Sequence, residues 1–161
     1  MERLWSPWRD AYVTEASSAS TRACFFCAAA SGEQTELLVG QDAATITLLN
    51  RFPYNPGHVM VAPRAHVPDL LAACDEDAAA MMVAARRAMR ALQSAMRPDG
   101  FNLGVNQGPV AGASVEHVHL HVVPRWGGDT NFMPVVGETK VLPESLDQTA
   151  QKLRAAYAEV A

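Results

Sequence analysis

The stretch that decides the fold is His117-Val-His-Leu-His-Val-Val123, in which histidines alternate with apolar residues. Alternation with a period of two is typical of a β-strand, because successive side chains point to opposite faces. His117, His119 and His121 would then lie on one face about 7 Å apart, with the apolar residues between them buried on the other face. Imidazole can act as nucleophile, acid, base or metal ligand near neutral pH. We therefore expect a chemical site on this strand.

The composition sets limits on organisation and partners. A chain of 161 residues, 49% of them hydrophobic, is long enough for one compact domain. The formal net charge of -4 argues against a general affinity for nucleic acid, but a few backbone N–H groups can still hold the phosphates of a small nucleotide. No membrane partner is expected, because no apolar stretch is long enough to span a bilayer. The lack of a secretory signal and the odd number of cysteines, three, predict a reduced, cytoplasmic location.

The remaining pattern predicts an α+β domain around the histidine strand. An antiparallel sheet of about five strands is expected, with strands at 36–39, 44–49, 58–62, 101–106 and 115–123. Apolar residues recur at helical spacing over 75–97, which predicts one long helix, and 145–160 suits a C-terminal helix packed on the sheet. Residues 1–22, which include two tryptophans in L-W-S-P-W-R, are predicted to form an N-terminal arm, and residues 23–161 a single domain.

Three motifs follow one another along the chain: N-R-F-P-Y-N-P-G-H at 50–58, a glycine-rich loop that begins N-Q-G at Asn106, and the alternating histidines. In this order and at these separations they resemble the histidine-triad (HIT) family of nucleotide hydrolases and transferases, over roughly Cys24 to Arg125. The segments outside the triad region, L-W-S-P-W-R and G-G-D-T-N-F-M-P, are similar to a bacterial branch described as diadenosine tetraphosphate phosphorylases.

The resemblance implies a two-step displacement at the α-phosphorus of a dinucleoside polyphosphate such as diadenosine tetraphosphate. His119 would attack and carry the nucleotidyl group until phosphate or water removes it, which divides one difficult step into two. A main-chain carbonyl would hold the other ring nitrogen of His119, so that the attacking nitrogen is unprotonated. His121 would hydrogen-bond the phosphate, and Ser114 would donate to the bridging oxygen as the leaving group departs. His117 completes the catalytic triad.

The resemblance also implies a nucleotide pocket around the triad. Asn50 would contact the ribose, His58 would lie near the nucleotide and Asn106 would lie beside the α-phosphate. The glycines of the loop allow backbone N–H groups to approach a phosphate closely. By resemblance, the phosphate cradle consists of Gly112, Ala113, Ser114 and Val115. Asn106 and Ala113 stand where the fragile-histidine-triad branch commonly carries glutamines, so the hydrolysis of diadenosine triphosphate by that branch is less expected here.

Cys24 and Cys27 form a C-x-x-C pair, the spacing of a zinc knuckle, which supplies half of a tetrahedral site. Family members with such a pair hold zinc with the two cysteines, the histidine after the P-G-H strand and the first triad histidine. By that resemblance His66 and His117 complete the site. The zinc would be structural and would fix the strand that carries His119. A redox pair, or two ordinary buried thiols, are the alternatives.

Other interpretations of the triad remain open at this point. The histidines could be satisfied inside a core, or hold a catalytic metal, although no Asp or Glu shares their strand face. An enzyme with the same nucleophile could instead be a nucleoside phosphoramidase of the Hint type, which the loop from Asn106 also resembles. A non-catalytic nucleotide-binding regulator is a further alternative.

Two more expectations concern distal phosphates and assembly. Arg9, Arg125 and Lys140 are candidates to bind a distal phosphate, with a solvated surface charge as the default interpretation. Family members pair as two-fold dimers that extend the sheet, so the resemblance implies a homodimer. The tryptophan arm could support a larger assembly, such as a tetramer.

Overall fold

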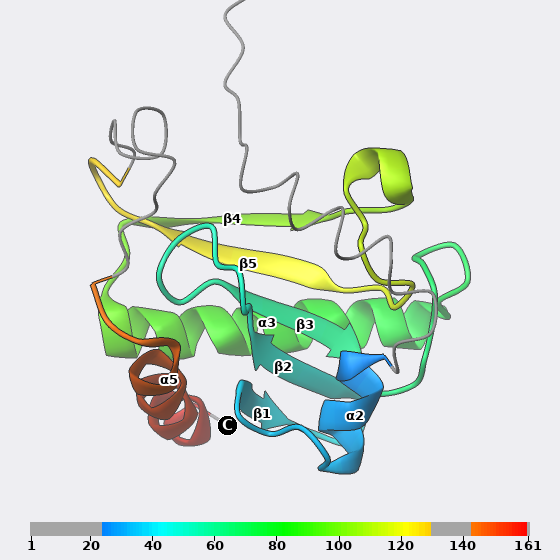
Figure 1. The fold of residues 1–161 in the computed structure, drawn as a ribbon, viewed down its shortest axis with the longest axis horizontal. Helices are drawn as coiled ribbons and strands as arrows, with labels where there is room; N and C mark the ends of the chain where they lie inside the picture. The colour runs from blue at the N-terminus through cyan, green and yellow to red at the C-terminus, as the bar shows by residue number, and fades with distance from the viewer. Residues whose placement is uncertain (1–23, 130–142, 161) are drawn as a thin grey trace, which may run out of the picture.

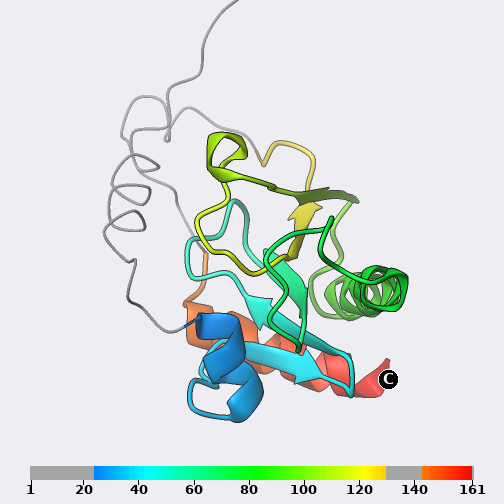
Figure 2. The same cartoon turned by 90° about the vertical axis from the view of Figure 1, so that its right-hand side faces the viewer.

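The computed structural model describes residues 24–129 and 143–160, which form one antiparallel sheet flanked by helices on both faces (Figures 1 and 2). The strands are β1 Leu38–Gln41, β2 Thr45–Leu49, β3 Val59–Pro63, β4 Gly100–Val105 and β5 Leu120–Arg125. The helices are α2 Phe25–Ser31, α3 Asp75–Met96, α5 Leu146–Glu159 and the short 3-10 helix η1 Pro109–Ala111. The predicted α+β class, with five strands, one long helix and a C-terminal helix, is confirmed for these residues. The predicted arm, residues 1–22, lies outside them.

The order of the strands in the sheet is β1-β2-β3-β5-β4, and every neighbouring pair is antiparallel. The strand that carries the triad's last histidine therefore lies inside the sheet, between β3 and β4. His121 lies opposite Met60 on β3 and opposite Gly104 on β4. Because directly opposed residues in an antiparallel pair share a face, these three positions define the face of the sheet on which the site is built.

A separate hydrophobic core lies on each face of the sheet. On one face, Val61, Leu120 and Val122 are buried together with apolar residues of α3 and α5. On the other face, Met60 is buried with Phe26 from α2 and with apolar residues of β2. All residues of β2 and β3 are buried, as expected for strands covered on both sides. The histidine face of β5 therefore adjoins the smaller core under α2, on a rigid part of the sheet.

The long helix α3 begins at the first residue of its predicted range and ends one residue before the end of that range. Its N-terminus carries three acidic residues in the first turn, which interact favourably with the positive end of the helix dipole. Arg97 then adopts a left-handed conformation with φ 49°, directly before Pro98, which ends the helix. None of the described helices combines the length and the apolar character that a membrane span needs.

The structure corrects two sequence predictions about elements. The strand predicted over 115–123 begins only at Leu120, so His117 and His119 lie in the irregular segment before it. The reason is that β3 and β4 offer no partner beyond the pairs that they form with Leu120, and the N–H of Val118 instead donates to Val67 O at 2.7 Å. The second correction is α2, a helix that was not predicted. The other strands agree with the predictions to within two residues at each end.

Candidate active site and metal cluster

His119 is fixed by the backbone of its own segment. Its Nδ1 lies 2.8 Å from the carbonyl oxygen of His117, which can only accept, so Nδ1 carries the proton. In the neutral ring, Nε2 then has a lone pair. Burial lowers the pKa of His119, and its effect exceeds the opposing effect of the His117 carbonyl. The expected carbonyl partner is thus present, and the ring is neutral and able to act as a nucleophile at pH 7.

His121 carries its proton on the other ring nitrogen, because of a chain of hydrogen bonds that sequence reasoning did not predict. The backbone N–H of Tyr54 donates to Nδ1 of His58 at 3.1 Å, so Nε2 of His58 carries the proton. That Nε2 lies 2.9 Å from Nδ1 of His121 and donates to it. The neutral His121 ring therefore carries its own proton on Nε2 and presents an N–H donor there.

The two imidazoles lie side by side with complementary protonation. The ring centroids of His119 and His121 are 4.8 Å apart and the planes are inclined by 73°. This is closer than the spacing of about 7 Å that the strand model implied, because only His121 lies in the strand. A lone pair on Nε2 of His119 next to an N–H on Nε2 of His121 suits attack at phosphorus with stabilisation of a phosphate oxygen.

Phe26 is a second feature that the sequence analysis missed. Its ring is fully buried and packs against His117 and His119, with centroid distances of 5.0 and 5.2 Å. It is contributed by α2, which starts directly after Cys24. The only sequence signal was the pair of phenylalanines between the cysteines of the C-x-x-C pair. Phe26 therefore restricts the two rings from the side of the smaller core.

The predicted nucleotide-binding residues fall into two loops. Asn50 begins the first, where its side-chain oxygen accepts the N–H of Phe52 at 2.9 Å, and its Nδ2 lies 3.4 Å from Nδ1 of His58. His58, which was expected near the nucleotide, is fully buried, and its Nε2 bonds to Nδ1 of His121. The contact between His58 and His121 thus connects the first loop to the triad.

The second loop follows β4 and contains the glycine-rich sequence. Gly108 and Gly112 have φ values of 82° and 89°, which favour glycine. The N–H of Ala113 donates to Gly108 O at 3.2 Å, and Nδ2 of Asn106 donates to Gly112 O at 3.4 Å. These bonds shape the loop internally, so the N–H of Ala113 serves the loop itself. Ser114 and Val115 are half-buried and lead into the segment of His117.

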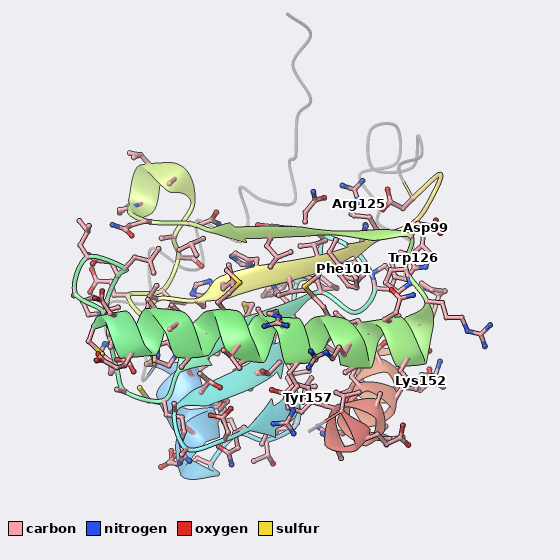
Figure 3. All side chains as sticks on the ribbon, turned by 180° about the vertical axis from the view of Figure 1, so that it is seen from behind. Asp99, Phe101, Arg125, Trp126, Lys152 and Tyr157 are labelled. Carbon is pink, nitrogen blue, oxygen red and sulfur yellow. The ribbon has the colours of Figure 1, made fainter. Side chains whose placement is uncertain are left out.

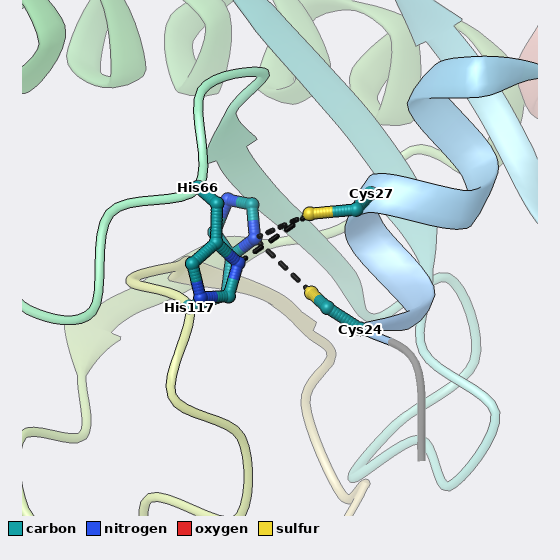
Figure 4. A group of neighbouring side chains, drawn as sticks. All are labelled: Cys24, Cys27, His66 and His117. Atoms are coloured by element: carbon teal, nitrogen blue, oxygen red, sulfur yellow. Dashed lines mark hydrogen bonds between the residues drawn. The ribbon is translucent and has the colours of Figure 1, made fainter. Parts of the chain in front are cut away.

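The four predicted metal ligands come together (Figure 4). The ligand atoms of Cys24, Cys27, His66 and His117 all lie within 4.8 Å of one another. Nδ1 of His117 is 3.2 Å from Sγ of Cys24, and Nδ1 of His66 is 3.4 Å from Sγ of Cys27. These residues belong to the start of α2, the connection after β3 and the segment before β5, which only the folded chain brings together.

The donor set of this cluster fits zinc. Two thiolates and two imidazoles are a common tetrahedral zinc set. Nε2 of His117 lies 2.9 Å from Pro63 O and must donate to it, which leaves the lone pair of Nδ1 directed at the thiols. Burial and the neighbouring Cys24 thiol raise the pKa of Cys27. A divalent cation would reverse that preference by stabilising the thiolates.

The cluster and the nucleophile share His117. Its ring faces the cysteines and its carbonyl oxygen accepts the Nδ1 proton of His119. The alternative that the triad holds a catalytic metal is disfavoured, because Nδ1 of His121 accepts the proton of His58, which leaves a proton on Nε2 of His121, and because Nδ1 of His117 faces the cysteines. The guanidinium of Arg125 bonds to Asp129 and Asn102, which supports a structural role for this charge over the binding of a distal phosphate. Arg9 and Lys140 lie outside the described residues.

Comparisons with known proteins identify the family of the chain. The family model of the HIT domain matches residues 31–128, which is more than half of the chain. The chain therefore belongs to the histidine-triad family, as the three motifs predicted.

Three relatives show how close the likeness is. The chain is 40% identical to "AP-4-A phosphorylase" of Mycobacterium tuberculosis H37Rv over 166 residues, which cover 98% of this chain and 85% of the relative. A "ZN-bound histidine triad family protein" from Mycobacterium smegmatis has a TM-score of 0.73 and 33% identity, with coverage of 85% and 94%. The "histidine triad nucleotide-binding protein ST2152" from Sulfolobus tokodaii has a TM-score of 0.72 and 25% identity, with coverage of 84% and 93%. The prediction of an enzyme of this family is confirmed.

Proposed function

We propose that the chain cleaves dinucleoside polyphosphates of the diadenosine tetraphosphate type at the α-phosphorus, through a nucleotidyl group carried on His119. The observation that carries this proposal is the hydrogen bond from Nδ1 of His119 to His117 O, which leaves a lone pair on Nε2 of a neutral, buried ring. The 40% identity to a mycobacterial AP-4-A phosphorylase supports the choice of substrate.

The proposed reaction has two steps. First, Nε2 of His119 bonds to the α-phosphorus, and the bond from that phosphorus to the bridging oxygen breaks, which releases ATP from diadenosine tetraphosphate. The N–H on Nε2 of His121 donates to a phosphate oxygen, and Ser114 donates to the departing oxygen. Second, phosphate or water attacks the phosphorus, which restores the lone pair of His119 and releases ADP or AMP.

Zinc is proposed as a structural ion held by Cys24, Cys27, His66 and His117. When bound there, it would supply a cross-link between α2 and the segment of the nucleophile, with no open position for water. The likeness to a Zn-bound relative of known structure supports this assignment.

Product analysis tests the proposed function. The full-length chain is incubated with diadenosine tetraphosphate, with and without inorganic phosphate, and the nucleotides are separated. ADP and ATP formed only with phosphate would identify a phosphorylase, and AMP and ATP formed without phosphate would identify a hydrolase. Absence of products under both conditions, or equal turnover by His119→Ala, would overturn the proposal.

A second candidate activity is the hydrolysis of nucleoside phosphoramidates. It is favoured by the loop N-Q-G-P-V-A-G-A-S, which begins at Asn106 and resembles the loop of that branch. Adenosine phosphoramidate is the discriminating substrate. A larger kcat/KM for the phosphoramidate than for diadenosine tetraphosphate would favour this candidate. Tight AMP binding without turnover of either substrate would favour a regulator.

The proposed assembly is a homodimer that extends the sheet. β4 is an edge strand, and its Leu103 is 40% exposed, so the strand offers backbone groups and apolar surface for pairing. We further propose that residues 23–161 form a single domain and that residues 1–22 form an arm. Light scattering of the full-length chain would show a mass of twice 17.3 kDa for a dimer.

A further inference from the structure

Several hydrogen bonds converge on one carboxylate beyond the end of β5. Arg125 contacts Asp129 through both carboxylate oxygens, with Nε at 2.6 Å and the second guanidinium contact at 2.8 Å. The backbone N–H of Trp126 donates to the same carboxylate at 3.1 Å. Figure 3 shows Arg125 and Trp126 at the end of the sheet where β4 begins and β5 ends. The guanidinium of Arg125 holds the pKa of Asp129 well below its usual range.

The same carboxylate holds a residue of the first nucleotide loop. Nδ2 of Asn55 donates to Asp129 at 2.7 Å and to Pro124 O at 3.0 Å, so both amide protons bind the end of β5. Asn55 is buried, with 6% of its surface exposed. The backbone carbonyl oxygen of Asn55 accepts the backbone N–H of His58 at 3.1 Å. The backbone on either side of His58 is therefore tied to the strand that carries His121.

We propose that Asn55, Arg125 and Asp129 form a clasp that positions His58, and through it fixes the protonation of His121. The clasp holds the first loop to β5 at Pro124, and the ring contact between His58 and His121 holds it again three residues earlier along the strand. With two attachments on one strand, the loop cannot slide along β5 without breaking a buried hydrogen bond. Asn55, Arg125 and Asp129 are positioning residues, because they act through His58.

The stabilising value of the ion pair alone does not explain this arrangement. Arg125 is 43% exposed in its side chain, and such surface pairs contribute about 0–1 kcal/mol. The buried element is Asn55, whose amide has two acceptors that only β5 and its continuation supply. A buried amide is costly unless its donors are bonded. The carboxylate thus serves to orient the buried amide of Asn55, which ties the first loop to the end of β5 and to the residues just after it.

Asn55→Asp is the most direct test, because it keeps the shape of the side chain and replaces the donor by an acceptor. The new carboxylate would face Asp129 and Pro124 O and repel both. Long-range proton–nitrogen spectra of the labelled full-length chain report the imidazole tautomers. In the unmodified chain we expect His58 and His121 each to carry the proton on Nε2. In Asn55→Asp we expect a mixture of tautomers for His121 and a decrease in kcat of at least tenfold.

Asp99→Ala is the matched control. Oδ2 of Asp99 accepts the N–H of Gly127 at 2.7 Å at the same end of the sheet. This hydrogen bond is separate from those that join Asn55, Arg125 and Asp129, so its loss perturbs the region and leaves the clasp intact. We expect unchanged tautomers and a kcat within about twofold, a difference of about 0.4 kcal/mol.

Retention of single tautomers and of kcat in Asn55→Asp would overturn the proposal, as would an equal loss in Asp99→Ala. If Asn55→Asp does not fold, Asn55→Ala removes the same donor without adding a charge, and the same tautomer change is expected. The kinetic part rests on the proposed function. If the unmodified chain turns over no substrate, the proposed function fails, while the tautomer comparison still decides whether the clasp orients His58.

Discussion

His119 and His121 show that the same side chain takes opposite roles according to its neighbour. A carbonyl acceptor places the proton of His119 on Nδ1, and a donating ring places the proton of His121 on Nε2. In the proposed mechanism His119 is the nucleophile and His121 the phosphate-binding donor. The hydrogen bond to His117 O fixes the tautomer of the first, and the hydrogen bond from His58 in the first loop fixes that of the second. His58, a residue outside the triad, decides which nitrogen of His121 carries the proton, whereas the carbonyl of His117 decides it for His119.

The first prediction concerns His58, which orients His121. The ring centroids of His58 and Tyr54 are 4.6 Å apart, so His58→Phe keeps a ring against Tyr54. The substitution removes the N–H that donates to His121. Loss of one preorganised donor to a reacting group lowers the rate by about 10²–10³-fold. Because His58 acts through His121 and does not itself touch the reacting group, we expect kcat to fall by about 10- to 100-fold. Steady-state kinetics measure this. An unchanged kcat would show that the tautomer of His121 does not matter.

Sequence reasoning identified the histidines and cysteines at this scale, because their spacing and order are local. It missed Phe26, and it did not predict the hydrogen bond between His58 and His121. Both omissions have the same origin. The pairs Phe26–His119 and His58–His121 join residues far apart along the chain, and a single sequence shows no signal for such contacts.

At the scale of elements, the turn before His58 packs closely on α3. Gly57 has φ 76°, and a Cβ built there would lie 2.7 Å from Sδ of Met96 and 2.9 Å from Cδ2 of Leu92. The position thus requires glycine for its backbone conformation and for the approach of the helix. Contact with the C-terminal end of α3 therefore helps to fix the position of the first loop relative to the sheet.

The second prediction compares Gly57→Ala with Gly32→Ala. Both glycines have positive φ, but a Cβ at Gly32 would meet nothing within 4 Å. Gly32→Ala should lower the free energy of unfolding by about 1–2 kcal/mol, the cost of a left-handed residue. Gly57→Ala should cost about 1–3 kcal/mol more, because of overpacking. Urea denaturation measures both values, and equal losses would contradict the packing argument.

The third prediction concerns the pH dependence of stability at the end of β5. The pKa of Asp129 is lowered in the folded chain, chiefly by Arg125, so its ionised form stabilises the fold above the unfolded pKa of about 3.9. That contribution is lost as the pH falls through the lower, folded value. Asp129→Asn should therefore be less stable than the unmodified chain at pH 5 to 7, and the difference should shrink below about pH 4. Thermal unfolding across this range measures it, and a constant difference would contradict the assignment.

Two elements show where local patterns fail. The alternation of His117 to Val123 predicts a strand, but a strand also needs neighbours, and β3 and β4 pair with β5 only from Leu120 onwards. The helix α2 has no side-chain cap at Cys24 and spans only seven residues, so its sequence carries a weak helical signal. In contrast, α3 and α5 have clear periodicity and termini, and their predictions hold.

For the whole molecule, the metal cluster joins α2 to two segments that flank the paired strands β3 and β5. The fourth prediction is that the purified chain contains about one equivalent of zinc, as expected for a tetrahedral set of two cysteines and two histidines. Cys24→Ser should contain less than half an equivalent. Chelation should lower the Tm of the unmodified chain and leave that of Cys24→Ser unchanged, because metal binding adds to folding free energy.

Cys74→Ser is the matched control for this cysteine substitution. Cys74 is exposed and caps the N-terminus of α3, where its side chain accepts the N–H of Asp77. Serine is a good N-cap, so the zinc content and the effect of chelation should match those of the unmodified chain. Less than half an equivalent of zinc in the unmodified chain, or the same content in Cys24→Ser, would refute the assignment.

The fold class and the candidate members of the site could be predicted because three motifs, in their order and at their separations, resemble the HIT family, whose model matches residues 31–128. Their arrangement could not, since the strand order β1-β2-β3-β5-β4 decides which loops meet at His121. The clasp is the clearest example. Its members, Asn55 and Asp129, are separated by the whole of α3 and β4, and only the pairing of β3 with β5 brings them together.

The measurement that tests the central claim most directly is the detection of a nucleotidyl group on His119. The full-length chain is mixed with diadenosine tetraphosphate without phosphate, quenched in denaturant within one turnover, and analysed by peptide mass spectrometry. The account predicts an adenylate on the peptide of His119 and none in His119→Ala. Turnover of the substrate with no adduct at that histidine, or an adduct at another residue, would contradict it.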